Sequence, residues 1–183
     1  MSNVASSRRW YDDKPLLSET IKNLLSLPYS LQLVIVEGVV YLLNKECEAQ
    51  HLIRALRSVG HQNVTGLHKS KNRRRQYDAN PYLHKAMNYL LILSTEGQAL
   101  IAEQVQELLE CNLEYFKTCK EFGGDSDLKD VAELTSVYVE QGNEAALQQV
   151  NQIREEFLSG VRAQNKITMA ATGSEMQVRG DAL

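Results

Sequence analysis

The residues best able to do chemistry form a short basic stretch, residues 69–75, with the sequence KSKNRRR. Its five fixed positive charges repel one another, and a fold gains nothing from gathering them unless anions lie nearby. Phosphates of a nucleic acid or an acidic protein surface would supply those anions. The alternatives are a solvated loop, or a loop that pairs with acidic residues of the same chain. We expect an anionic partner, bound by Lys69, Lys71, Arg73, Arg74 and Arg75.

Aromatic residues accompany these cations. Tyr77 follows the basic stretch and Tyr82 lies a little further on, so that either ring could stack on a base. Trp10 is the only tryptophan, and it follows Arg8 and Arg9 in an otherwise polar N-terminus. An exposed tryptophan beside arginines is typical of a partner-binding anchor, although it could instead fold back on the first helix. Tyr77 and Trp10 therefore join the candidate partner-binding residues.

Metal-ligand patterns are sparse. Glu48 and His51 form a single E-x-x-H step, and Cys47 lies four residues before the histidine. Di-iron bundles use two such steps with two further glutamates, and a zinc site would need a second Cys/His pair. An ordinary helix surface explains these residues better, so we expect no metal and no cofactor.

Motifs for nucleophilic catalysis are missing as well. The sequence has no GxSxG elbow, and no glycine-rich loop follows a strand. Glutamates do recur at helical spacing, and they would form a solvated helix face, a divalent-ion face or a face for a basic partner. They are Glu103, Glu107, Glu110 and Glu114. We expect a non-catalytic protein, and keep a helical enzyme or a metal- or small-molecule-binding protein as the second alternative.

The cysteines and the apolar segments bear on location. Cys47, Cys111 and Cys119 are odd in number and form no CxxC pair, which disfavours a secreted disulfide framework. The N-terminus lacks the apolar core of a signal peptide. The longest apolar stretch, residues 31–43, is shorter than the roughly 20 residues of a membrane helix. We expect a cytoplasmic protein with free thiols and no membrane partner.

The charge of the chain is divided between its halves. Residues 1–85 carry 13 Lys/Arg against 7 Asp/Glu, a net +6, whereas residues 86–183 carry 7 against 16, a net −9. Such a chain can neutralise itself internally, offer separate faces to two partners, or associate head to tail. Together with the apolar surplus of the second predicted helix, this division leads us to expect a homo-oligomer.

Hydrophobic periodicity predicts six or seven helices. Residues 31–43 are apolar on two sides, which favours a central helix over a β-hairpin turning at Glu37 and Gly38. The helix expected at 46–59 is either separate or a continuation of the one before it. Thr95 and Gln98 have capping-box spacing, and Asp125 or Ser126 can cap the helix that ends before Gly142. The expected helices cover about 15–27, 30–45, 46–59, 81–93, 95–122, 127–141 and 144–164.

These elements predict an all-α helical bundle of six or seven helices, in one domain of residues 1–164. Residues 60–80 lose all periodicity and form the predicted long basic loop, and residues 165–183 form a predicted flexible tail. A split into two helical subdomains near residues 60–80 is the alternative.

One segment resembles a known repeat. Residues 131–150 are similar to one unit of a tetratricopeptide repeat, through Tyr138, the Gly142-Asn143 pair and Ala146. No second copy occurs at the required spacing of about 34 residues, so we expect a plain helical hairpin. The resulting hypothesis is a non-catalytic interaction or regulatory protein, with a protein partner expected on the basic loop. A nucleic-acid-binding regulator that uses the same loop is the first alternative.

Overall fold

The computed structural model describes residues 9–52, 77 and 80–160 of the 183-residue chain. All the regular elements in these ranges are α-helices, apart from a 3₁₀ residue at Tyr77, and no strand occurs among them. The prediction of an all-α bundle is therefore confirmed. The basic stretch and residues 165–183 lie outside the described ranges. The helices are α1 (Pro15–Ser26), α2 (Tyr29–Ala49), α5 (Pro81–Ile92), α6 (Thr95–Glu121) and α7 (Leu128–Gln141), followed by a C-terminal helix over residues 143–160.

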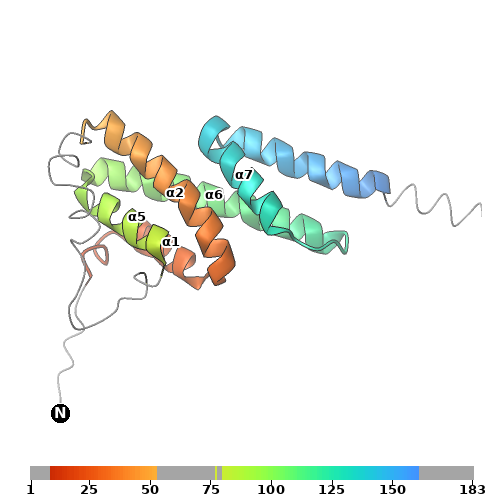
Figure 1. Cartoon of the computed structure of the whole chain (residues 1–183), viewed down its shortest axis with the longest axis horizontal. Coiled ribbons are helices and arrows are strands. Elements are labelled where there is room, and N and C mark those ends of the chain that lie inside the picture. Colours follow the sequence, from red (N-terminus) through yellow and green to blue (C-terminus); the bar gives the residue numbers. More distant parts are fainter. Residues whose placement is uncertain (1–8, 53–76, 78–79, 161–183) are drawn as a thin grey trace, which may run out of the picture.

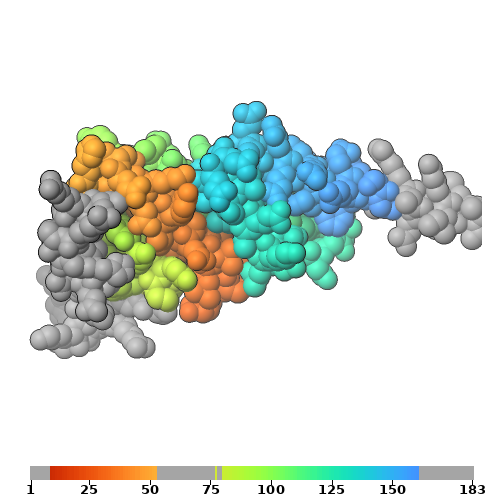
Figure 2. Space-filling view, turned by 45° about the horizontal axis from the view of Figure 1, so that its top comes forward, coloured from red at the N-terminus to blue at the C-terminus, as the bar shows by residue number. Residues whose placement is uncertain are grey.

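The long helix α6 organises the molecule (Figure 1). Its 27 residues extend for about 40 Å. The helices α1, α2 and α5 surround its N-terminal half, where the Thr20 hydroxyl of α1 lies 3.4 Å from the Ala102 carbonyl oxygen. The helix α7 and the C-terminal helix lie along its other half. Figure 2 shows these two side by side at one end of an elongated molecule.

A single cluster of buried apolar side chains joins the six helices of the described ranges. It extends from the N-terminal helices through α6 to Val131 and Leu134 of α7 and to Ala146 and Val150 of the C-terminal helix. The largest fully buried side chains are Tyr11, Ile21, Ile35, Leu43, Leu83, Met87, Ile101, Leu108, Tyr115 and Leu134.

Residues 31–43 belong to a helix, as predicted, and not to a hairpin. They lie within the 21-residue α2, which is buried on two sides because α5 and α7 both pack on it. Of the two alternatives for residues 46–59, a continuation of the preceding helix is confirmed as far as Ala49, where α2 ends with Gln50 as its C-cap. His51 then has φ of 56°, a left-handed conformation that ends the helix. Residues 53–59 of the expected helix lie outside the described ranges.

The N-caps of α6 and α7 differ from the expected ones by one or two residues. The Ser94 hydroxyl accepts a hydrogen bond from the Gly97 N–H at 3.1 Å, so Ser94 and not Thr95 caps α6. Asp127, and not Asp125 or Ser126, caps α7. Serine, threonine and aspartate at neighbouring positions are all good N-caps, and tertiary packing decides which one is used.

None of the helices in the described ranges is both long enough and apolar enough to cross a membrane.

Candidate functional site

An open groove of about 810 Å³ runs between α7 and the C-terminal helix. The two helices form an antiparallel hairpin around Gly142, whose φ of 94° is readily adopted by glycine. We call this feature the hairpin groove. It is lined by Asp130, Glu133, Val137, Gln141, Ala145, Gln148, Gln149, Gln152, Ile153, Glu156, Phe157 and Gly160.

Two buried tyrosines attach α7 to α6. The Tyr138 hydroxyl donates to Glu107 at 2.8 Å. The Tyr115 hydroxyl donates to Asp130 at 2.8 Å and accepts the Asp127 N–H at 3.0 Å. Burial is the main cause that raises the pKa of both tyrosines. These phenols therefore stay protonated and hold the first wall of the groove in place.

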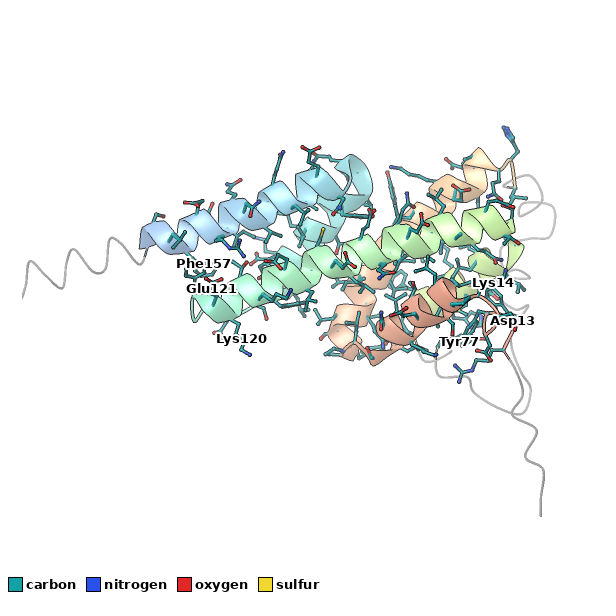
Figure 3. The ribbon with its side chains drawn as sticks, turned by 180° about the vertical axis from the view of Figure 1, so that it is seen from behind. Asp13, Lys14, Tyr77, Lys120, Glu121 and Phe157 are labelled. Atoms are coloured by element: carbon teal, nitrogen blue, oxygen red, sulfur yellow. The ribbon has the colours of Figure 1, made fainter. Side chains whose placement is uncertain are left out.

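The C-terminal helix is attached to α6 at two places. The Arg154 guanidinium donates to Glu114 at 3.0 Å and to the Thr118 hydroxyl at 3.3 Å. At the far end, the Phe157 ring stacks on Phe122 with centroids 5.7 Å apart. The same ring covers Gly124, where an added Cβ would lie 2.7 Å from it. Figure 3 shows Phe157 beside the C-terminal end of α6, near Glu121.

The solvent-exposed side of the groove carries acidic side chains, whereas its side nearest the protein core is apolar. Glu133 and Glu156 are exposed, and each accepts a hydrogen bond from a glutamine amide, Gln149 at 3.1 Å and Gln152 at 3.2 Å. Val137, Ile153 and Phe157 are partly buried and pack against the core. Among the residues that the structure describes, none that lines the groove is a lysine, arginine or histidine. The groove therefore suits a ligand that presents both apolar groups and positive charge.

The described ranges contain no group of three or more His, Cys, Asp or Glu side chains arranged to hold a metal ion. Glu48 still lies in α2, but His51 lies beyond the end of that helix. The single E-x-x-H step is therefore not displayed on a continuous helical face.

All three cysteines are free and buried. Burial raises the pKa of the Cys47 and Cys111 thiols to about 11, from an ordinary value of 9.0. Cys111 donates to the Asn143 side-chain oxygen at 2.9 Å and so attaches the start of the C-terminal helix to α6. These thiols serve packing, because a nucleophilic cysteine requires a lowered pKa.

These raised pKa values predict thiol reactivity that depends on unfolding. At pH 8 we expect the native protein to react with a disulfide reagent far more slowly than the protein in urea.

The buried thiols also make the free energy of unfolding depend on pH. Their contribution to it is fully present below pH 9 and falls as the pH rises from 9 towards 11, because the thiols of the unfolded chain ionise first. Urea unfolding from pH 8 to 10.5 measures this fall. Replacing Cys47 and Cys111 together with alanine should flatten it, leaving the share due to Tyr89, Tyr115 and Tyr138, whose pKa values burial also raises. An unchanged slope would contradict the assignment.

The residues predicted to bind a partner do not all lie in the described ranges. Trp10 is partly buried against the core, with Lys14 over its ring at 5.8 Å and Tyr11 edge-on at 5.4 Å. Tyr77 is 6% exposed, and in Figure 3 it lies at the opposite end of the molecule from Phe157. Lys69, Lys71, Arg73, Arg74 and Arg75 lie outside the described ranges.

The four glutamates on the acidic face of α6 differ in the contacts that they make. Glu107 accepts from Tyr138, and Glu114 pairs with Lys117 and Arg154. These contacts, chiefly the hydrogen bonds from the two cations, lower the pKa of Glu114. The exposed Glu103 and Glu110 make no such contact among the described residues. The acidic face is therefore in part a docking surface for the hairpin, a role that its sequence spacing did not indicate.

Searches against protein-family models, curated proteins and solved structures found no match to this chain.

Proposed function

We propose that this chain is a non-catalytic, cytoplasmic interaction protein that binds a protein partner. The hairpin groove carries this proposal. It is open to solvent, its walls are polar and its floor is apolar. Reaction sites usually enclose their substrate, whereas an open groove between two helices is a common place for another protein to dock.

The negative net charge of the hairpin supports a partner that carries positive charge. Residues 127–160 carry seven Asp/Glu and two Lys/Arg, a net −5. One of the two cations, Arg154, is held by Glu114 and so does not neutralise the groove. Such a field speeds the approach of a cationic partner and disfavours an anionic one.

We propose the basic stretch, residues 69–75, as a second and separate contact for an anionic partner. Replacing Arg73, Arg74 and Arg75 together with alanine is expected to leave the thermal midpoint unchanged and to abolish a salt-sensitive interaction. Pull-downs at low and moderate salt measure this. The matched control removes three exposed lysines elsewhere, Lys22, Lys120 and Lys129, and should retain the interaction. Recovery of the same partners by the arginine variant would contradict a role for the stretch.

The alternative of a nucleic-acid-binding regulator rests on the same stretch, with its five cations and neighbouring tyrosine. A filter-binding titration distinguishes it, because phosphate contacts give an affinity that falls steeply with salt concentration. Absence of binding at low salt would exclude this alternative and leave the protein partner.

We also propose a homo-oligomer, in which the basic half of one copy meets the acidic half of another outside the hairpin groove. Sedimentation at low and high salt tests this arrangement. A monomer at every concentration and salt would exclude it without affecting the binding of another protein.

A further inference from the structure

The geometry points to one class of occupant for the hairpin groove, a cationic amphipathic α-helix of a partner protein. This inference rests on the proposed function and adds the chemistry of the partner to it.

The shape of the groove fits a helix. On α7 the lining residues are 130, 133, 137 and 141, and on the C-terminal helix they are 145, 148, 149, 152, 153, 156, 157 and 160. Both sets recur with the helical period, so each helix contributes a straight stripe of lining residues, one residue wide on α7 and two residues wide on the C-terminal helix. The 14 residues of α7 extend for about 20 Å, the length of roughly four helical turns. A third helix would lie along this length and over the two stripes, which the Gln149–Glu133 hydrogen bond joins at one point.

The charge of the groove selects a cationic occupant. Asp130, Glu133 and Glu156 line it, and the described part of its lining contains no cation. Glu133 and Glu156 are bonded to glutamine amides, which satisfy hydrogen bonds but do not neutralise charge. A lysine or arginine of the occupant would do so. Phosphates of nucleic acid and of anionic lipids carry the wrong sign, and the groove therefore favours a protein.

The floor requires apolar groups from the same occupant. Val137, Ile153 and Phe157 are only partly buried, although each packs against the core. An amphipathic helix meets both requirements, because apolar residues at i, i+3, i+4 and i+7 would cover the floor while flanking cations reach the carboxylates. A peptide that is basic but has no apolar stripe would leave the floor uncovered.

The test uses the full-length protein and a designed peptide of about 18 residues, long enough for five helical turns. Leucines form one helical stripe and lysines flank it, with a fluorescent label at one end. Two control peptides replace lysine with glutamate, or keep the composition in an order without a stripe. Fluorescence anisotropy should show saturable binding of the first peptide, with affinity at least about tenfold above both controls.

Charge reversal then locates the binding. Glu133→Lys with Glu156→Lys is expected to weaken binding at least about tenfold. The matched control, Glu103→Lys with Glu110→Lys, changes the net charge equally on an exposed face of α6 and should keep the affinity within about twofold. Should the first variant fail to fold, Gln148→Arg with Gln152→Arg introduces repulsion at exposed positions without removing a carboxylate. Equal affinity of groove and control variants would overturn the proposal.

The remaining outcomes separate this inference from the proposed function. If the leucine–lysine peptide does not bind, while a partner that depends on the basic stretch is still captured, the groove assignment fails and the interaction function stands. If the peptide does not bind and no such partner is captured, both the groove assignment and the proposed interaction function fail. A dimer at low salt that the groove variant alone dissociates would place a second copy in the groove, and would also overturn the assignment to another protein.

Discussion

Gly38→Ala is expected to destabilise the protein by about 1–2 kcal/mol, although alanine ordinarily favours a helix over glycine by about 1 kcal/mol. The reason is the crossing of α2 over α7. A Cβ built at residue 38 would overlap the Thr135 methyl group and would lie 3.4 Å from Val139. Both neighbours belong to the well-packed α7, so the crossing would have to open. Urea unfolding measures the change.

A second substitution identifies the cause of this loss. Thr135→Ser removes the methyl group that the new Cβ would meet, so it should restore part of the stability lost in Gly38→Ala. A double-mutant cycle isolates the interaction, which we expect to be about 1 kcal/mol in favour of the pair. The serine substitution alone should cost stability, since it removes a buried methyl group. An increase in stability on Gly38→Ala would show that the two helices do not meet at this position.

Gln98→Leu is expected to cost about 3 kcal/mol, because the Gln98 side chain joins three elements. Its amide nitrogen donates to the Leu90 carbonyl at 2.7 Å and the Leu93 carbonyl at 3.2 Å, and its oxygen accepts from Lys14. The residue is 5% exposed, so these groups would lose their partner inside the protein. Thermal unfolding with calorimetry measures the effect.

The same substitution at Gln106 is the control for Gln98. Gln106 lies on the same helix, is partly exposed and makes no hydrogen bond among the described residues. Gln106→Leu should change the stability by less than about 0.5 kcal/mol. Similar losses at the two positions would mean that leucine, and not the broken hydrogen bonds, causes the effect.

Much of the fold could be predicted from hydrophobic spacing and helix-breaking residues. Pro15 and Pro81 begin helices, and Gly142 ends one, as their backbone preferences require. The end of α2 could not be predicted, because the sequence beyond Ala49 continues with a helical pattern. The side chain of Gln50 bonds to Ser94 at the start of α6, and only the tertiary structure brings these residues together.

The role of Gln98 shows the same limit. Its spacing from Thr95 fits a capping box, in which the glutamine would bond within its own helix turn. In the structure it bonds instead to the last carbonyls of α5, because α5 and α6 meet at a tight corner. Local spacing identified an important polar residue but could not identify its partners.

The candidate site was harder to predict than the fold. The basic stretch is visible in sequence because like charges are adjacent there, whereas the groove residues are spread over about 30 positions on two helices. Gln149, Gln152 and Glu156 have the spacing of any solvated helix face. These residues differ from such a face only because a groove lies between their helix and α7. The position of the C-terminal helix, and with it the groove, depends on the packing of Phe157 against Gly124 and on the contact of Arg154 with α6.

A titration of the isotope-labelled protein with the leucine–lysine peptide, followed by backbone amide chemical shifts, tests the central claim most directly. We predict that the largest shifts occur in residues 130–141 and 145–160, on the two walls of the hairpin groove. Residues of α1 and α5 should change little, because those helices lie around the other half of α6. Shifts centred on α1 or α5, or no shifts at saturating peptide, would contradict the assignment of this groove as the partner-binding site.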